Sequence, residues 1–147
     1  MAHDVFISHA KDDKTKADLL CLQLEQAGIR CWIAPRDVRP GRNWGSEIIR
    51  GLDNARVMIL LLSASSNRSR PVIKEVERAF GKEIVIIPVR LEDVVPSDAL
   101  EFFLSSDQWF DATTPRSILV RQIANGSRSM KLFEKDLELT RIFLFPI

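Results

Sequence analysis

Two continuously apolar runs, at residues 57–62 and 84–89, constrain the fold of this chain more than any other feature. A strand with one face in water alternates apolar and polar residues, whereas a strand covered on both faces is apolar throughout. Apolar residues at helical spacing precede, separate and follow the two runs. Because strands that alternate with helices form parallel sheets, the pattern predicts an α/β domain.

The remaining elements continue the alternation. We expect strands at residues 5–7, 29–33, 57–62, 84–89 and 109–110, and helices at 17–27, 44–55, 71–80, 99–104 and from 114 onward. The serine-rich stretch 63–70 is expected to be a loop, and Pro88 to mark a strand end or a bulge. Right-handed crossovers favour a flavodoxin-like, five-stranded parallel sheet of order 2-1-3-4-5 with helices on both faces. Such sheets bind ligands beyond the carboxyl ends of strands 1 and 3, at residues 8–13 and 63–70 here.

The connection from Ala34 to Gly41 is unusually long for a strand-to-helix loop. Such loops take about two to six residues, whereas this one needs roughly ten. It contains two prolines, two arginines, an aspartate and a glycine. Two interpretations stay open at this point: a surface excursion held by proline turns, or a binding loop beside the ligand crevice.

Composition narrows the class of protein. A net charge of +1 over 147 residues argues against a general nucleic-acid-binding surface. Cys21 and Cys31 are too few for a disulfide framework or a metal-ligand set, and their patterns predict reduced core thiols, which favours a cytoplasmic location. We see neither a signal-peptide pattern nor an apolar run of about eighteen residues that could span a membrane.

Other proteins with this topology fit the crevice residues less well. A phosphoacceptor receiver domain needs an aspartate at the end of strand 3, where this chain has Leu61-Leu62-Ser63. A flavin mononucleotide carrier needs a phosphate cradle after strand 1, but Ser8-His9-Ala10-Lys11 has no glycine. The chain also lacks the G-x-G-x-x-G of a dinucleotide-binding domain.

Three motifs, in the right order and spacing, resemble the Toll/interleukin receptor (TIR) domain family. Residues 4–9 (DVFISH) are similar to its box 1, and residues 36–41 (RDVRPG) to its box 2 in the so-called BB loop. Glu75, within VIKEVE, matches the glutamate of NAD-cleaving members. The resemblance covers residues 3–125, and it implies NAD⁺ as a consumed substrate, with no cofactor and no metal.

The resemblance implies that Glu75 is the catalytic residue. Nicotinamide leaves NAD⁺ as a neutral pyridine, so the reaction needs no general acid but does need a carboxylate beside an oxocarbenium-like ribose. On a helical wheel Glu75 lies about 85° from the centre of its helix's apolar stripe. It can therefore be partly desolvated and still face a crevice, while Lys74 and Arg78 point to solvent. The expected stripe comprises Val72, Val76, Ala79 and Phe80.

Further site roles are implied by the same resemblance. Substrate binding is assigned to Phe6, Ser8, His9, Ala10, Lys11, Arg36 and Trp44. The loop that gates the pocket and contacts other TIR domains comprises Arg36, Asp37, Val38, Arg39, Pro40 and Gly41. From the residues alone, each of three side chains also has a structural interpretation. His9 can stabilise a turn, Lys11 can be a solvated surface lysine, and Trp44 can be a packed core residue. A local ion pair is expected between Arg36 and Asp37.

One position departs from the family pattern, because Pro71 stands where many active members have a tryptophan.

The resemblance leaves two candidate functions open. The first is an NAD⁺ glycohydrolase, with ADP-ribose or a cyclic isomer as product, that acts on self-assembly in immune defence or virulence signalling. The second is a non-enzymatic adaptor that binds other TIR domains through the loop. Residues 1–130 are expected to form the domain, and residues 131–147 an apolar tail or the start of a further module.

Overall fold

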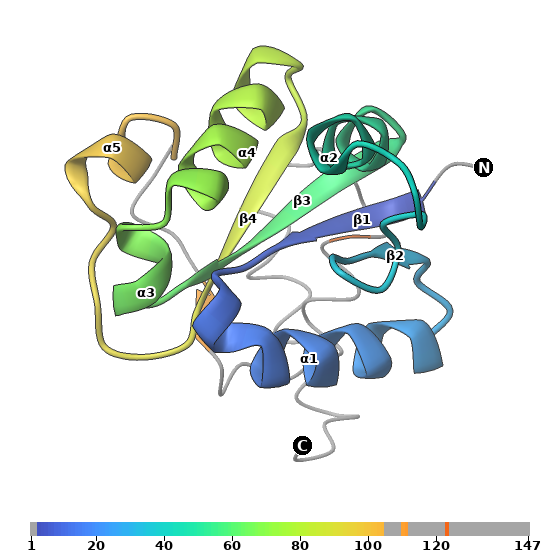
Figure 1. Cartoon of the computed structure of the whole chain (residues 1–147). Helices are drawn as coiled ribbons and strands as arrows, with labels where there is room; N and C mark the ends of the chain where they lie inside the picture. The colour runs from blue at the N-terminus through green and yellow to red at the C-terminus, as the bar shows by residue number, and fades with distance from the viewer. Residues whose placement is uncertain (1–2, 105–109, 112–122, 124–147) are drawn as a thin grey trace.

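The protein forms one five-stranded, all-parallel sheet of order β2-β1-β3-β4-β5 (Figure 1). A computed structural model describes residues 3–104, 110–111 and 123. The strands are β1 (His3–Ser8), β2 (Cys31–Trp32), β3 (Ala55–Leu62), β4 (Val85–Arg90) and β5 (Phe110–Asp111). The helices are η1 (Lys11–Asp13), α1 (Lys14–Gln26), α2 (Trp44–Asp53), α3 (Ala64–Asn67), α4 (Arg70–Gly81) and α5 (Asp98–Glu101). The predicted fold class and strand order are confirmed.

Two apolar cores, one on each face of the sheet, explain the continuous apolar runs. Val57, Ile59 and Leu61 of β3 pack in the core beneath α1, and the alternate residues Met58, Leu60 and Leu62 pack in the core beneath α2, α4 and α5 (Figure 1). All six side chains are at most 1% exposed. Each contributes about 1.5–3 kcal/mol through burial of apolar surface, which makes β3 the centre of the fold.

Two strands differ from their predicted extents. β2 has two residues instead of five. At its start the backbone N–H of Ile29 bonds to the carbonyl of Leu24 in α1, and at its end the N–H of Ile33 bonds to the carboxylate of Asp37 instead of to a neighbouring strand. Pro88 lies inside β4, opposite Leu60, and neither ends the strand nor forms a bulge. Proline is tolerated there because β5 pairs only with Val89 and Arg90, so within the described chain the outer side of β4 is free at Pro88.

Three helical segments also differ from expectation. The serine-rich stretch contains α3, whose first turn is held by a reciprocal capping box between Ser63 and Ser66. Helix α5 spans four residues instead of six. Phe80 was expected in the core but is 50% exposed, because it packs at the surface against Phe102 and Phe103 of the segment that follows α5.

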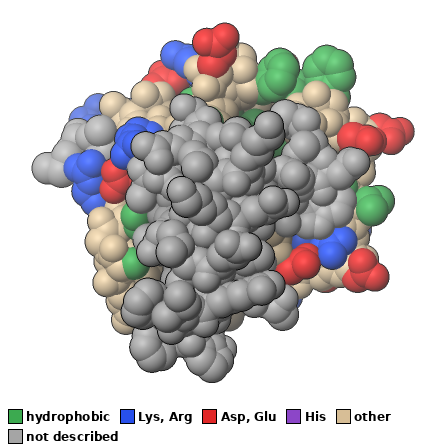
Figure 2. All heavy atoms as spheres, turned by 180° about the vertical axis from the view of Figure 1, so that it is seen from behind, with side chains coloured by type: hydrophobic (Ala, Val, Ile, Leu, Met, Phe, Trp, Pro, Cys, Tyr) green, Lys and Arg blue, Asp and Glu red, His purple; other side chains and the backbone are tan. Residues whose placement is uncertain are grey.

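Several predictions fall outside the described residues. They include Trp109, most of the helix expected from residue 114 and the tail 131–147. Ile123 is described, and it is buried in the core beneath α1. Among the residues that the structure covers, no helix is long and apolar enough to cross a membrane. Seen from behind, acidic and basic side chains of the described residues lie beside one another at several places around the edge of the view (Figure 2).

Candidate active site

A cleft of about 830 Å³ lies between α2 and α4. Trp44 and Ile49 line it from α2, and Pro71, Lys74 and Glu75 line it from α4. The cleft is large enough to hold part of a nucleotide-sized ligand, since small-molecule sites typically measure about 300–1,000 Å³.

The crevice expected between strands 1 and 3 is bridged by the protein's own side chains. Ser63 Oγ, just after β3, donates to the carboxylate of Asp13, and Ser65 Oγ donates to Asp12 Oδ2 at 3.2 Å. These bonds join the two loops that were expected to open around a ligand. The described cleft opens between two helices on one face of the sheet, and the ligand site expected from topology stays a prediction.

Glu75 is the carboxylate that this cleft desolvates. Ser8 Oγ, at the carboxyl end of β1, donates a 2.7 Å hydrogen bond to Glu75 Oε1. Burial raises the pKa of Glu75 from its ordinary value to about 7, and the hydrogen bond from Ser8 offsets part of that rise. The carboxyl group therefore titrates at neutral pH and forms part of the cleft wall.

The sequence of α4 explains how Glu75 reaches this position. Val72, Val76 and Ala79 are buried on the sheet, and Glu75 lies at the edge of that stripe, half-buried as the helical wheel predicts. Lys74 is exposed. Arg78, which was expected to point to solvent, is half-buried instead and pairs with Asp53 of α2.

The residues expected at the end of β1 divide between core and surface. Phe6 stacks on Trp32 at 5.0 Å in the core, 1% exposed, so the structure does not bring its ring to the cleft. Ala10 is also buried, whereas Lys11 is exposed at the start of η1. The His9 ring nitrogens face the carbonyl oxygens of Ala10 and Ala34, at 2.9 and 3.0 Å, so His9 joins the segment after β1 to the loop.

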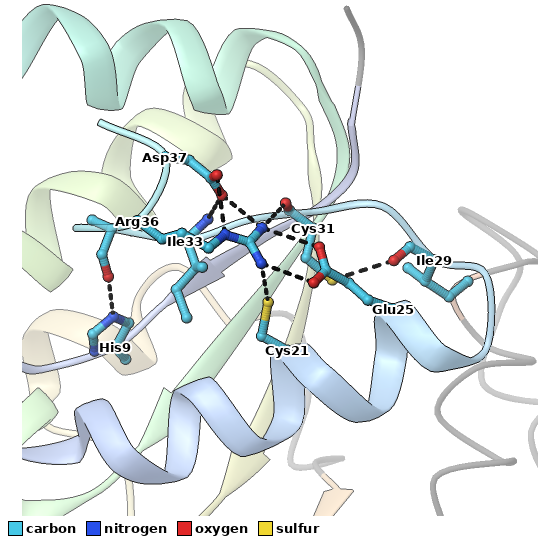
Figure 3. A network of polar contacts seen from close by, with 9 residues as sticks. His9, Cys21, Glu25, Ile29, Cys31, Ile33, Arg36 and Asp37 are labelled. Atoms are coloured by element: carbon cyan, nitrogen blue, oxygen red, sulfur yellow. Dashed lines mark hydrogen bonds and ion pairs between the residues drawn. The ribbon is translucent and has the colours of Figure 1, made fainter. Parts of the chain in front are cut away.

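Arg36 anchors the first half of the loop on α1 and does not line the cleft. The predicted ion pair with Asp37 is confirmed at 2.9 Å. Arg36 also donates to both carboxylate oxygens of Glu25, at 2.8 and 3.0 Å, and to the Cys31 carbonyl at 2.9 Å (Figure 3). Asp37 closes the turn, because its backbone N–H bonds to Ile33 O and its carboxylate accepts from the Ile33 N–H, both at 2.9 Å.

Glu47 anchors the second half of the loop, and sequence reasoning missed it. Its carboxylate, 3% exposed, accepts from Arg39 Nε and Nη2, both at 2.8 Å, and from the Arg39 backbone N–H at 2.9 Å. Arg50 adds a contact at 3.3 Å. The Arg39 guanidinium holds the pKa of Glu47 far below its usual range. The sequence did contain a signal for this ion pair: Glu47 lies in the first turn of the helix that follows the arginine-bearing loop.

The start of α2 places an aromatic side chain at the cleft. Asn43 caps the helix by accepting from the Ser46 N–H at 3.0 Å. Trp44 follows at once and is 54% exposed in the cleft wall, which contradicts the interpretation of a packed core residue. At the rim, Arg70 and Lys74 have no ion-pair partner among the described residues, whereas Lys82 pairs with Asp53.

Comparisons with known proteins agree on one family. The family whose description is "TIR domain" matches residues 5–124. The chain is 34% identical over 82 residues to the NAD(+) hydrolase PdTIR of Paracoccus denitrificans, which covers 55% of this chain and 27% of that protein. It is 31% identical over 100 residues to the probable 2′ cyclic ADP-D-ribose synthase BdTIR of Brachypodium distachyon, with 67% of this chain and 44% of that protein covered. The chain thus spans less than half the length of either relative.

A solved structure shows the same fold. The TIR domain of the Toll-related receptor TRR-2 from Hydra magnipapillata superposes with a TM-score of 0.70 at 25% identity. The match covers 84% of this chain and all of that one.

Proposed function

This chain belongs to the TIR domain family, and on that premise we propose that it cleaves NAD⁺ to nicotinamide and ADP-ribose. Two relatives carry names of NAD⁺-consuming enzymes, which supports the reaction class. The observation that carries the proposal is Glu75, a desolvated carboxyl group in the wall of the cleft between α2 and α4.

The proposed mechanism uses one carboxylate. The bond between ribose C1′ and the nicotinamide nitrogen breaks, and its electron pair stays with the nitrogen, which becomes neutral. Ionised Glu75 stabilises the positive charge that develops on the ribose. Ser8 holds one carboxylate oxygen at 2.7 Å and so fixes the rotamer of Glu75. Water then adds to C1′ and loses a proton to solvent; attack by another part of the same molecule would give a cyclic product.

Other parts of the cleft supply binding. The exposed ring of Trp44 offers a stacking surface for a base, a role that Pro71 cannot fill at the position of the family's usual tryptophan. Arg70 and Lys74 suit the pyrophosphate because they are cations without ion-pair partners in the described chain. We assign Arg36 to holding the loop rather than to binding substrate, since Glu25 and Asp37 occupy its guanidinium.

Activity is proposed to depend on self-assembly through the loop of residues 34–41. Arg39, Pro40 and Gly41 are exposed, while Arg36 and Arg39 fix the loop on two different helices. A preformed exposed loop loses little conformational entropy when a second TIR domain docks on it. The same observation supports the second candidate function, an adaptor that binds other TIR domains without catalysis. Roles in immune defence or virulence signalling, and a cytoplasmic location, stay predictions.

One experiment separates the two functions. Protein at several concentrations is incubated with NAD⁺, and nicotinamide release is measured by chromatography for the wild type, Glu75→Gln and Glu101→Gln. Glu101 is an exposed glutamate of α5 away from the cleft, so its variant should match the wild type. We expect turnover per molecule to rise with concentration and to be lost in Glu75→Gln. Absence of turnover at every concentration would favour the adaptor, and full turnover in Glu75→Gln would refute the assignment of Glu75.

A further inference from the structure

Three metal-ligating side chains converge on the α1 side of the loop, remote from the cleft. Cys21 and Glu25 lie one turn apart on α1, and Cys31 lies in β2 (Figure 3). Their Sγ atoms and a carboxylate oxygen all lie within 4.8 Å of one another. Both cysteines are free and buried, which confirms the prediction of reduced core thiols.

The cluster adjoins a cavity that gives it an entry path. The cavity measures about 330 Å³, and Glu25, Cys31, Arg36 and His3 contribute to its wall. The Nδ1 atom of His3 is buried with no hydrogen-bond partner in the described structure. Buried polar atoms in folded proteins nearly always have a hydrogen-bond partner, so an unsatisfied one in the wall of this cavity calls for an explanation such as a bound ligand.

The donor set suits one class of ion. Two thiolates and a carboxylate favour a soft or borderline divalent cation such as Zn²⁺ over Ca²⁺ or Mg²⁺, which prefer oxygen. Sulfur ligands of tetrahedral zinc lie about 3.8 Å apart, given Zn–S bonds of about 2.3 Å, so a small contraction of the cluster suffices. Counting cysteines along the sequence could not reveal this set, because Glu25 joins it only through the helical spacing of four residues.

Arg36 now occupies the same donor atoms. Its Nη1 lies 3.5 Å from Cys21 Sγ and 2.8 Å from Glu25 Oε1. A guanidinium and a metal ion cannot share these lone pairs, and their charges repel. The Arg36 side chain is 47% exposed, so it can swing into solvent when an ion enters.

We propose that Cys21, Glu25 and Cys31 form a binding site for a zinc-class ion that competes with Arg36. Both thiols lose their protons on binding, and a water molecule completes the coordination. Arg36 leaves Glu25 and Cys21, so the first half of the loop loses its anchor on α1. Metal binding and the loop conformation of this structure are therefore antagonistic, whatever reaction the domain performs.

The test measures binding directly, with no enzymatic readout. Reduced protein in a non-thiol, non-chelating reductant is titrated with Co²⁺, and thiolate-to-metal charge-transfer absorption is recorded; Zn²⁺ is then titrated by calorimetry. We expect one ion per chain and release of about two protons. The chain has only two cysteines, so the absorption reports this cluster alone. Circular dichroism checks that each variant is folded.

Four variants make the proposal specific. Cys31→Ser should abolish the charge-transfer absorption, because the proposed site needs both thiolates. Glu25→Gln should weaken binding of the ion about 10–100-fold. Arg36→Gln should bind the ion roughly tenfold more tightly, because no guanidinium opposes it. Asp18→Asn, a carboxylate change elsewhere on α1, should have no effect. No absorption band, binding that survives Cys31→Ser, unchanged affinity in Arg36→Gln, or a Cys21–Cys31 disulfide in place of the metal would each overturn the proposal.

Discussion

Replacing Glu75 by glutamine should stabilise the protein at alkaline pH while removing its proposed activity. The folded state raises the pKa of Glu75 above its unfolded value, so it favours the protonated form. The stabilisation from that preference is complete below the unfolded pKa and is lost as pH rises through the folded pKa of about 7. Glutamine resembles the protonated acid at every pH and can still accept the hydrogen bond from Ser8.

The size of the effect follows from the pKa change. A rise from 4.5 to about 7 corresponds to at most about 3.4 kcal/mol at 1.36 kcal/mol per pKa unit. Glu75 is only half-buried, so water reduces the penalty for its charge, and we expect about 1–3 kcal/mol at pH 8. For a domain of this size that amounts to a gain in Tm of roughly 2–10 °C.

The assay is thermal or urea unfolding followed by circular dichroism at pH 5 and pH 8. Wild type and Glu75→Gln should differ little at pH 5 and diverge at pH 8. Glu101→Gln, on the exposed surface of α5, should follow the wild type at both pH values. Equal stability of wild type and Glu75→Gln at pH 8, or a difference independent of pH, would refute the idea that the cleft desolvates this carboxylate.

The remaining predictions concern the pH dependence of the proposed reaction, the anchoring of the loop and the packing of Gly51 against Trp32. Because only ionised Glu75 stabilises the oxocarbenium charge, kcat/KM for NAD⁺ should rise with pH around 7 and level off above it; a flat profile contradicts the mechanism. Glu47→Gln should lower the Tm and speed proteolytic cleavage within residues 34–43, measured by mass spectrometry, because the loop loses its buried anchor. Gly51→Ala should cost about 1–3 kcal/mol in urea unfolding, since a Cβ there would lie 2.6 Å from the Trp32 ring.

The fold could be predicted from the sequence because its main signals are local. A run such as residues 57–62 is apolar at every position only when both faces of its strand are covered, and one core on each face bears this out. The position of Glu75 at the edge of the apolar stripe of α4 follows from the helical repeat, which can be read directly from the spacing of apolar residues in the sequence. The prediction for Pro88, a strand end or a bulge, was wrong because β4 can accommodate a proline wherever β5 does not pair with it, and the extent of β5 along β4 is not a local property of the sequence.

The site was predicted less completely because it depends on partners far apart in the chain. Nothing local indicates that Ser8 donates to Glu75, 67 positions away. The same holds for Arg36, which bonds to Glu25 rather than turning to the cleft, and for the buried carboxylate of Glu47. Family motifs marked Phe6 for the pocket, yet its ring is packed on Trp32 in the core. Such choices are made by three-dimensional packing and not by spacing.

The two arginine anchors of the loop should respond differently to salt. The ion pair between Arg36 and Glu25 joins side chains that are 47% and 36% exposed, so dissolved ions screen it. The Glu47 carboxylate beneath Arg39 is 3% exposed and largely shielded from those ions. Rising ionic strength should therefore weaken the anchor of the first half of the loop on α1 and leave the second half fixed at Glu47. A docking partner would then meet a loop whose opening depends on the salt around it.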